Sequence, residues 1–292
     1  MAETITGRVV ASYSLDCVVE DADGGLHRCL PRRRLGRPYC GDYVRFRDEA
    51  GGKVIEEILP RRNLLARPNY RGQLRPFAAN VDLLVVVIAV QPPFERGLID
   101  RYLVLAEHLE LEALIWLNKL DLAAPAQREA LLQQLRIYQR LGYPVLAGSS
   151  LTGEGVAALK ARFQDKTGIL VGQSGVGKSS LIQHLVPDRA LRIGSLSEAT
   201  GLGRHTTTET TLYHLPDGGD LIDSPGIRTL RLGHLEPEQI EHGFVELRAF
   251  QGECRFANCR HRDEPGCAVQ AALQRGEIDP LRLASFHELL AE

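Results

Sequence analysis

The chain has 292 residues, of which 44% are hydrophobic and 25% are charged, and its formal net charge is −2. This length suffices for two domains, or for one domain with sizeable appendages, and the charge excludes binding of nucleic acid through overall basicity. The longest uninterrupted apolar run, Leu83 to Val90, is too short to cross a bilayer, and the first residues lack the features of a signal peptide. We therefore expect a cytoplasmic protein with no membrane partner.

Residues 1–66 are predicted to form short strands, because apolar and polar residues roughly alternate between glycine-containing turns such as Asp21–Gly25. A small β-barrel of the oligonucleotide-binding (OB) type fits this length, and a generic small barrel is the alternative. Residues 1–76 carry a net charge of +4. Arginines flank one barrel loop close to Tyr39 and indicate RNA binding, although a solvated charged surface would show the same pattern: Arg28, Arg32, Arg33, Arg34 and Arg37.

A basic stretch follows the barrel, from Pro60 to Pro76. It contains five arginines and no acidic residue. Its prolines disfavour a regular element, so we expect a linker here. The first domain is accordingly assigned to residues 1–66, and the second begins at residue 67.

From Val81 the pattern changes to alternating strands and helices. Val81–Val90 is expected to be a buried strand, and helices are expected at Leu98–Leu109 and from Pro125 to Gly142. The alternation predicts a mostly parallel sheet with helices on both faces, a central α/β domain over residues 67–235. Residues 236–292 are expected to be helical, and the last helix is expected to have Asp279 as its N-cap and Pro280 at its first position.

A phosphate-binding loop is predicted where an apolar run meets a helical pattern. The sequence GQSGVGKS matches G-x-x-x-x-G-K-[ST], in which backbone N–H groups and the helix N-terminus face the phosphates. Lys178 is expected to reach the β- and γ-phosphates, and Ser179 to bind Mg²⁺. A glycine-rich loop without a ligand is the alternative. The predicted nucleotide contacts here are Gly172, Gln173, Ser174, Gly175, Val176, Gly177, Lys178, Ser179 and Ser180.

A guanine-binding motif is predicted at the end of an earlier strand. Asn118, Lys119, Leu120 and Asp121 form N-K-x-D, in which the aspartate would accept hydrogen bonds from guanine N1–H and the 2-amino group. Adenine would leave that carboxylate desolvated and unpaired. Ser149 and Ser150 end the small-residue run that would supply backbone contact to guanine O6. Alone, N-K-x-D is a weak signal, and it gains weight beside the phosphate loop.

Two further segments are expected to respond to the γ-phosphate. Asp223-Ser-Pro-Gly226 fits D-x-x-G, whose aspartate would hold Mg²⁺ through water and whose glycine N–H would sense the phosphate. The run Thr206–Thr208 suits a switch whose threonine completes the Mg²⁺ shell. We favour Thr207, although the register among the three threonines stays open.

The motifs run in the order base motif, O6 contact, phosphate loop, threonine switch and D-x-x-G. An ordinary GTPase begins with the phosphate loop and ends with the base motif. One rotation of the sequence interconverts the two orders, so the chain is predicted to be a circularly permuted GTPase. Surface loops can accept such a rotation because termini and joins lie there.

The residue after D-x-x-G is Ile227, where many GTPases carry a glutamine that orients the attacking water. Isoleucine cannot hydrogen-bond a water, so intrinsic hydrolysis is expected to be slow unless another group positions it. His205, next to the threonine run, is the candidate catalytic residue, together with Lys178 and Thr207. An exposed loop histidine is the alternative.

Three cysteines and a histidine near the C-terminus predict a structural zinc site. Cys254, Cys259, His261 and Cys267 supply a full tetrahedral ligand set, which leaves no position for a reacting water. Buried free thiols or redox cysteines are the alternatives.

These elements together resemble the circularly permuted, small-ribosomal-subunit-dependent GTPase A family of bacteria. The resemblance rests on "LNKLDL", "GQSGVGKSSLI", "GRHTTT", "LIDSPGIR" and the cysteine–histidine set, and it covers essentially the whole chain. It implies GTP hydrolysis to GDP stimulated by the small (30S) subunit, a role in late subunit maturation, and contacts of the OB and zinc domains (residues 1–66 and 236–292) with rRNA. We expect one Zn²⁺ per subunit, Mg²⁺ with GTP, and a monomer. An RNA-binding scaffold with structural nucleotide and an ATP-dependent enzyme are the competing hypotheses.

Overall fold

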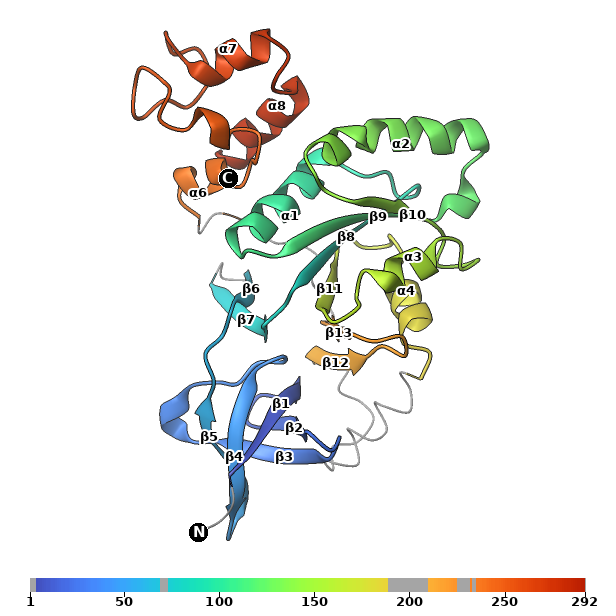
Figure 1. The fold of residues 1–292 in the computed structure, drawn as a ribbon, viewed down its shortest axis with the longest axis vertical. Coiled ribbons are helices and arrows are strands. Elements are labelled where there is room, and N and C mark those ends of the chain that lie inside the picture. The colour runs from blue at the N-terminus through green and yellow to red at the C-terminus, as the bar shows by residue number, and fades with distance from the viewer. Residues whose placement is uncertain (1–3, 69–72, 189–209, 225–231, 233–234, 292) are drawn as a thin grey trace.

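The computed structural model describes residues 4–68, 73–188, 210–224, 232 and 235–291. It shows three parts in a row: a barrel, a central sheet with helices, and a C-terminal group of helices (Figure 1). Among the described residues, no helix is both long enough and apolar enough to cross a membrane.

The N-terminal part is a closed five-stranded barrel, as the sequence predicted. Its strands are β1 (Ile5–Ser12), β2 (Cys17–Asp21), β3 (Leu26–Pro31), β4 (Tyr43–Glu49) and β5 (Gly52–Ile58), with a short 3₁₀ helix at Arg33–Leu35. The pairings β1–β2, β2–β3, β3–β5, β5–β4 and β4–β1 complete the circuit. Alternate side chains fill an interior of the barrel's own, which includes Val9, Val19, Val44, Phe46 and Ile55.

The predicted basic linker is wrong in part, because two strands form within it. β6 (Leu64–Pro68) and β7 (Leu74–Ala79) pair antiparallel as a separate two-stranded sheet. The prolines are tolerated for local reasons: Pro68 is the last residue of its strand, and Pro76 lies where the register shifts between Leu65 and Ala66. A bridge between Cys40 and Ala78 holds this hairpin against the barrel.

The central sheet carries the predicted α/β pattern. Its strands are β8 (Leu83–Ala89), β9 (Glu112–Asn118), β10 (Val145–Ala147), β11 (Thr167–Val171), β12 (Thr210–His214) and β13 (Asp220–Asp223), in the order β10-β9-β8-β11-β13-β12. All neighbours are parallel except β12, which is antiparallel to β13. From β8 the chain adds β9 and β10 on one side, and on the other side β11 is followed by the outer strand β12 and then by β13, which lies between them.

Helices cover both faces of this sheet. They are α1 (Arg96–His108), α2 (Pro125–Arg140), α3 (Val156–Ala161) and α4 (Lys178–Leu185). Every residue of β8 is buried, and its side chains alternate between two cores. Leu84, Val86 and Ile88 join the core that contains α1 and α2, whereas Leu83, Val85 and Val87 join the core of α3 and α4. This is why β8 is a continuous apolar run.

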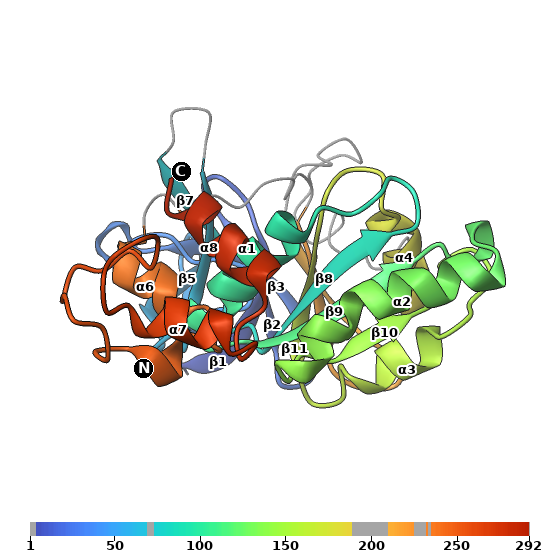
Figure 2. The same ribbon diagram turned by 90° about the horizontal axis from the view of Figure 1, so that it is seen from above.

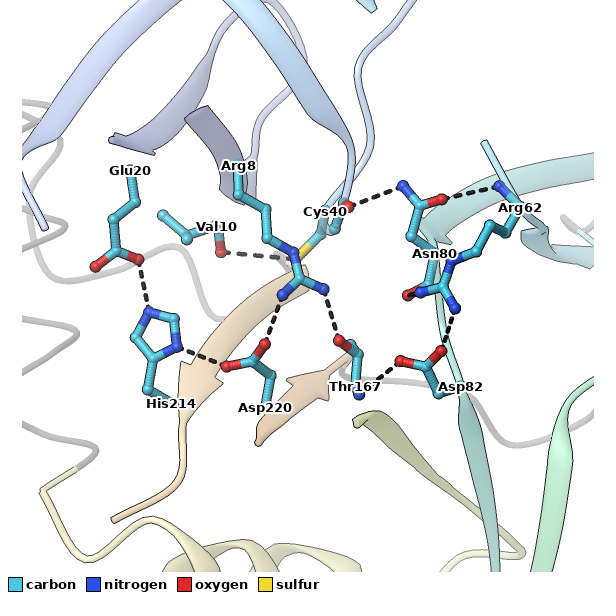
Figure 3. A network of polar contacts seen from close by, with 11 residues as sticks. Arg8, Val10, Glu20, Cys40, Arg62, Asn80, Asp82, Thr167, His214 and Asp220 are labelled. Atoms are coloured by element: carbon cyan, nitrogen blue, oxygen red, sulfur yellow. Dashed lines mark hydrogen bonds and ion pairs between the residues drawn. The ribbon is translucent and has the colours of Figure 1, made fainter. Parts of the chain in front are cut away.

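The barrel is joined to the sheet by backbone pairing. The end of β1, beyond its pairing with β4, stays paired with β2 and also pairs antiparallel with β12, with Ser12 opposite Thr210. At this junction Arg8 donates to Asp220 (2.5 Å) and to Thr167 (2.7 Å), and His214 lies between Asp220 and Glu20 (Figure 3). The barrel strands and the central strands consequently form one eleven-stranded sheet.

The C-terminal part contains α6 (Pro237–His242), a 3₁₀ helix at Arg248–Phe250, α7 (Ala268–Gln274) and α8 (Pro280–Leu289). As predicted, Asp279 caps the last helix, accepting a hydrogen bond from Leu281 N–H (2.9 Å). Helix α8 lies beside α1 (Figure 2), and its buried side chains Leu283, Phe286 and Leu289 belong to the same core as α1.

Candidate nucleotide-binding site and metal-ligand cluster

The loop between β11 and α4 has the backbone of a phosphate-binding loop. Gly172, Gly175 and Gly177 have φ of 140°, 81° and 94°, a range that favours glycine. A Cβ at Gly172 would also lie 2.1 Å from the Val87 carbonyl oxygen. Helix α4 begins at Lys178, whose Nζ donates to the carbonyls of Gly172 and Gln173 (2.7 Å each). The loop thus places an ammonium group and a helix N-terminus together, the arrangement that binds phosphate.

Asn118 joins the base motif to this loop. Its side chain is fully buried, and Nδ2 donates to the Val176 carbonyl (2.8 Å) and to Ser150 Oγ (3.1 Å). Ser150 N–H donates in return to Asn118 Oδ1 (2.9 Å). A Cβ at Gly177 would lie 2.3 Å from Asn118 Nδ2, so this glycine is required by the close approach of the two motifs. Segments 54 residues apart in the sequence thereby become one structural unit.

Lys119 and Asp121, the charged residues of the N-K-x-D motif, also contact neighbouring segments. Lys119 has φ of 63°, and its Nζ donates to the carbonyls of Gly175 (2.5 Å) and Gln91 (2.8 Å). Asp121 Oδ1 accepts a hydrogen bond from the buried Ser149 hydroxyl. Gln91 was missed by sequence reasoning, although its position directly after the buried strand β8 was a usable signal.

The motifs meet at the carboxyl edge of the sheet. The N-K-x-D motif begins at the last residue of β9, the phosphate loop follows β11, and Asp223 is the last residue of β13. The order in which the chain adds strands to the sheet reverses between the parallel neighbours β8 and β11. In open α/β sheets, ligands bind outside the carboxyl ends of the strands at such a reversal. The tertiary structure therefore assembles these predicted residues at one place.

The predicted switch residues are only partly within the described chain. Asp223 lies opposite Thr211 in the β12–β13 pair, and Thr210 Oγ1 donates to Ser224 Oγ (3.0 Å). His205, Thr206–Thr208, Gly226 and Ile227 lie outside the described residues. Their predicted roles stay predictions.

The four predicted metal ligands form a cluster. One ligand atom from each of Cys254, Cys259, His261 and Cys267 lies within 4.8 Å of all the others. His261 Nδ1 faces the sulfur atoms, 3.3 Å from Cys267 Sγ and 3.5 Å from Cys254 Sγ. Three thiols and an imidazole nitrogen converging on one point are the donor set that suits Zn²⁺.

Neighbouring groups orient these ligands. His261 Nε2 lies 3.4 Å from the Glu241 carboxylate, which is ion-pair range without an aligned hydrogen bond. Burial opposes ionisation of Cys267, but the N–H of Gln270 and His261 lower the pKa of its thiol. Burial, and after it the neighbouring sulfur atoms, raise the pKa of Cys259 to about 12, although the backbone N–H of His261 acts in the opposite direction. A cation is what allows several such thiolates to lie together.

The three barrel cysteines have a different environment. Cys17, Cys29 and Cys40 are fully buried among apolar side chains. Burial raises the pKa of all three thiols, that of Cys29 to about 12. They are neutral thiols that pack as small hydrophobic groups.

The predicted RNA-binding arginines of the barrel divide into two groups. Arg28 is paired with Asp16, and Arg32 with Glu49 and Glu56, so their charges are partly neutralised. Arg33, Arg34 and Arg37 are exposed. The basic character of this surface is therefore concentrated after β3.

Comparisons with known proteins agree with this geometry. Residues 58–233 match the family of RsgA GTPases. Small ribosomal subunit biogenesis GTPase RsgA of Haemophilus influenzae is 45% identical over 295 residues, covering 99% of this chain and 85% of the relative. The namesake from Mannheimia succiniciproducens is 44% identical, covering 100% and 84%.

Two solved structures are similar to this chain over nearly its whole length. YjeQ from Thermotoga maritima superposes with a TM-score of 0.80 at 35% identity, covering 99% of this chain and all of that one. YloQ, described as a circularly permuted GTPase, gives a TM-score of 0.78 at 30% identity over 99% and 94%. The likeness extends over the whole chain, barrel included, and the chain belongs to the RsgA family of GTP-hydrolysing enzymes.

Proposed function

We propose that this protein hydrolyses GTP to GDP and phosphate when it is bound to the small (30S) ribosomal subunit, and that it acts in the cytoplasm, as a monomer, late in assembly of that subunit. The observation that carries the proposal is the packing of Asn118 against the phosphate loop, which unites a guanine-binding motif with a phosphate site. The names of the relatives supply the subunit as partner.

In this proposal the nucleotide lies along the carboxyl edge of the sheet. Asp121 accepts from guanine, the Ser149–Ser150 backbone contacts O6, and Lys178 contacts the β- and γ-phosphates. Mg²⁺ binds to Ser179 and Thr207, and to Asp223 through water. Gly226 senses the γ-phosphate.

His205 is proposed to position the attacking water, because Ile227 has no hydrogen-bonding side chain. His205→Ala should lower the subunit-stimulated rate by about 100-fold, within the range for loss of a general acid–base group. GTP affinity should be unchanged, which equilibrium binding would check. An unchanged rate would remove His205 from the mechanism.

The cluster of Cys254, Cys259, His261 and Cys267 is proposed to hold one structural Zn²⁺ per subunit. Elemental analysis should find about one equivalent of zinc in the purified protein, and much less in Cys259→Ser. Cys29→Ser is the matched control, since Cys29 lies in the barrel interior. Much less than one equivalent in the wild type would contradict the proposal.

The decisive experiment is a multiple-turnover GTPase assay with purified small subunits. The subunits should raise the rate at least about tenfold, and Lys178→Ala should abolish the stimulated rate. Lys160→Ala, on α3, is the control lysine, because it forms an exposed pair with Asp217. A stimulated rate equal to the basal rate would count against the proposed function.

A further inference from the structure

A hollow of about 450 Å³ lies where the barrel, the β6–β7 hairpin and the start of β12 meet. Ser12 and Thr210, which pair across β1 and β12, belong to its lining. The described residues around it include three arginines and three aromatic rings, and none of them is acidic. The arginines and rings are Arg37, Arg67, Arg75, Tyr13, Tyr39 and Phe77. This volume falls in the range of pockets that hold a small molecule or a single nucleotide unit.

The aromatic rings of the hollow already interact with cations. The guanidinium of Arg37 lies 5.9 Å from the centre of the Tyr39 ring, and that of Arg67 lies 5.8 Å from the Phe77 ring. Arg37 also donates to the Tyr13 carbonyl (2.9 Å), which is a neutral acceptor and leaves its charge uncompensated there. Planar rings flanked by guanidinium groups are the surface on which nucleic-acid bases stack.

The hairpin brings two positive charges face to face. Arg67 and Arg75 lie directly opposite each other in the β6–β7 register. A phosphate group placed between them would match the geometry of the guanidinium donors on both strands.

We propose that this hollow binds one nucleotide of single-stranded RNA, with its base against Tyr39 and its phosphate between Arg67 and Arg75. The proposal rests on the proposed function, in which the barrel contacts rRNA, and it names the residues of that contact. RNA is favoured over an acidic peptide because stacking rings and opposed arginines are combined in one hollow.

One lining residue of the hollow, Thr210, connects it to the candidate nucleotide site of the central domain. Thr210 is paired with Ser12 of the barrel, and its Oγ1 donates to Ser224, the residue after Asp223. Thr210 also follows directly after the segment that contains the predicted switch threonines. It is therefore a positioning residue, through which RNA in the hollow acts on both segments that surround the γ-phosphate.

Binding is tested by fluorescence anisotropy with a labelled single-stranded RNA of about ten nucleotides. Arg75→Ala should weaken binding about tenfold at low salt and reduce the slope of log K against log[salt] by about 0.7, the value for one lost phosphate contact. Arg136→Ala is the matched control, because Arg136 is an exposed arginine on α2, remote from the barrel in Figure 1. Wild-type affinity and slope in Arg75→Ala would overturn the phosphate contact.

Stacking is tested in the same assay with a pair of variants. Tyr39→Ala should weaken RNA binding at least about fivefold, whereas Tyr39→Phe should retain it, because a phenyl ring stacks equally well. Equal affinities of the two variants would overturn the base contact. Poly-glutamate that competes as well as RNA would show a site for acidic chains and would also overturn it.

Coupling is tested with Thr210→Val, which removes the hydroxyl and keeps the shape. The variant should bind RNA like the wild type, while stimulation of GTP hydrolysis by small subunits falls several-fold. Stimulation equal to that of the wild type would overturn the coupling.

The thermal unfolding midpoint of each variant shows whether its fold is intact. If subunits stimulate the wild type and all the variants equally, only the hollow is misassigned. If they do not stimulate the wild type, the proposed function itself fails.

Discussion

The central domain is joined to its two neighbours in different ways. The junction with the C-terminal helices is buried: Arg282 on α8 and Asp100 on α1 have side chains only 2% and 1% exposed. The junction with the barrel is half-open, since Arg8 and Asp220 are 14% and 17% exposed and His214 is 48% exposed. One junction is built like the interior of a single domain, and the other like an interface between two.

Buried charges hold the C-terminal junction. Arg282 donates to Asp100 (2.5 Å) and to Glu246 (2.6 and 3.1 Å), and its guanidinium lies 4.4 Å from the Phe244 ring. Asp100 also accepts from the Tyr138 hydroxyl of α2 (2.9 Å). Every charge in this group is paired, which is the condition for keeping charges inside a core. The C-terminal helices and α1 should therefore unfold together.

The barrel keeps an interior core of its own, and its junction with the sheet combines a few apolar side chains, such as Val10 and Val18, with polar contacts at the half-open rim. Such contacts are weakened by water and salt, so the barrel junction should be the softer of the two. A softer junction suits the proposed contact of the barrel with RNA. The following predictions test this difference, from the largest expected effect to the smallest.

Arg282→Met should destabilise the protein by about 3–5 kcal/mol, because Asp100 and Glu246 would remain buried without their partner. Urea unfolding would measure this as a lower transition midpoint. Arg275→Ala is the matched control, since Arg275 and Glu277 form an exposed pair that contributes little to stability. If Arg282→Met and Arg275→Ala have equal midpoints, the C-terminal junction is not the buried core we describe.

Arg8→Met should have a smaller effect, a loss of about 1–2 kcal/mol, because it removes hydrogen bonds to Asp220 and Thr167 at a partly exposed position. Protease cleavage between the barrel and the sheet should become faster before the central domain unfolds. Arg45→Ala serves as control, since Arg45 pairs with Glu57 on the open surface of the barrel. Cleavage as slow as in the control would show that Arg8 does not hold the junction.

His214 should make the barrel junction sensitive to pH. Hydrogen bonds with Asp220 and then Glu20 raise the pKa of His214 to about 9, above the value of about 6.5 expected for the unfolded chain. A raised pKa means that the charged form stabilises the fold. This contribution is complete below about pH 6.5 and is lost as the pH rises through 9. Because the side chain is half exposed, we expect about 1 kcal/mol or less.

The difference in unfolding free energy between wild type and His214→Gln, measured from pH 6 to 10, isolates this contribution from other titrating groups. The difference should shrink as the pH rises. A difference that is constant with pH would exclude a charged His214 at the junction.

Much of the fold followed from local sequence patterns. The helices at α1 and α2, the capped last helix and the buried strand β8 lie where periodicity and capping residues indicated. The hairpin β6–β7 did not, because the prolines that argue against a strand are located at a strand end and at a register shift. Only the pairing partner reveals that these positions tolerate proline.

The sequence by itself identified the motifs of this protein: the phosphate-loop motif, the N-K-x-D motif, the rotated order of the motifs, and the four residues that could hold a metal ion, Cys254, Cys259, His261 and Cys267. These are short segments whose residue types and spacing carry the information. The tertiary structure alone decided what they touch. Asn118 meets Val176 across 58 residues, Arg282 meets Asp100 across 182, and Arg8 meets Asp220 across 212. Such contacts depend on strand order and on burial, which no local pattern encodes.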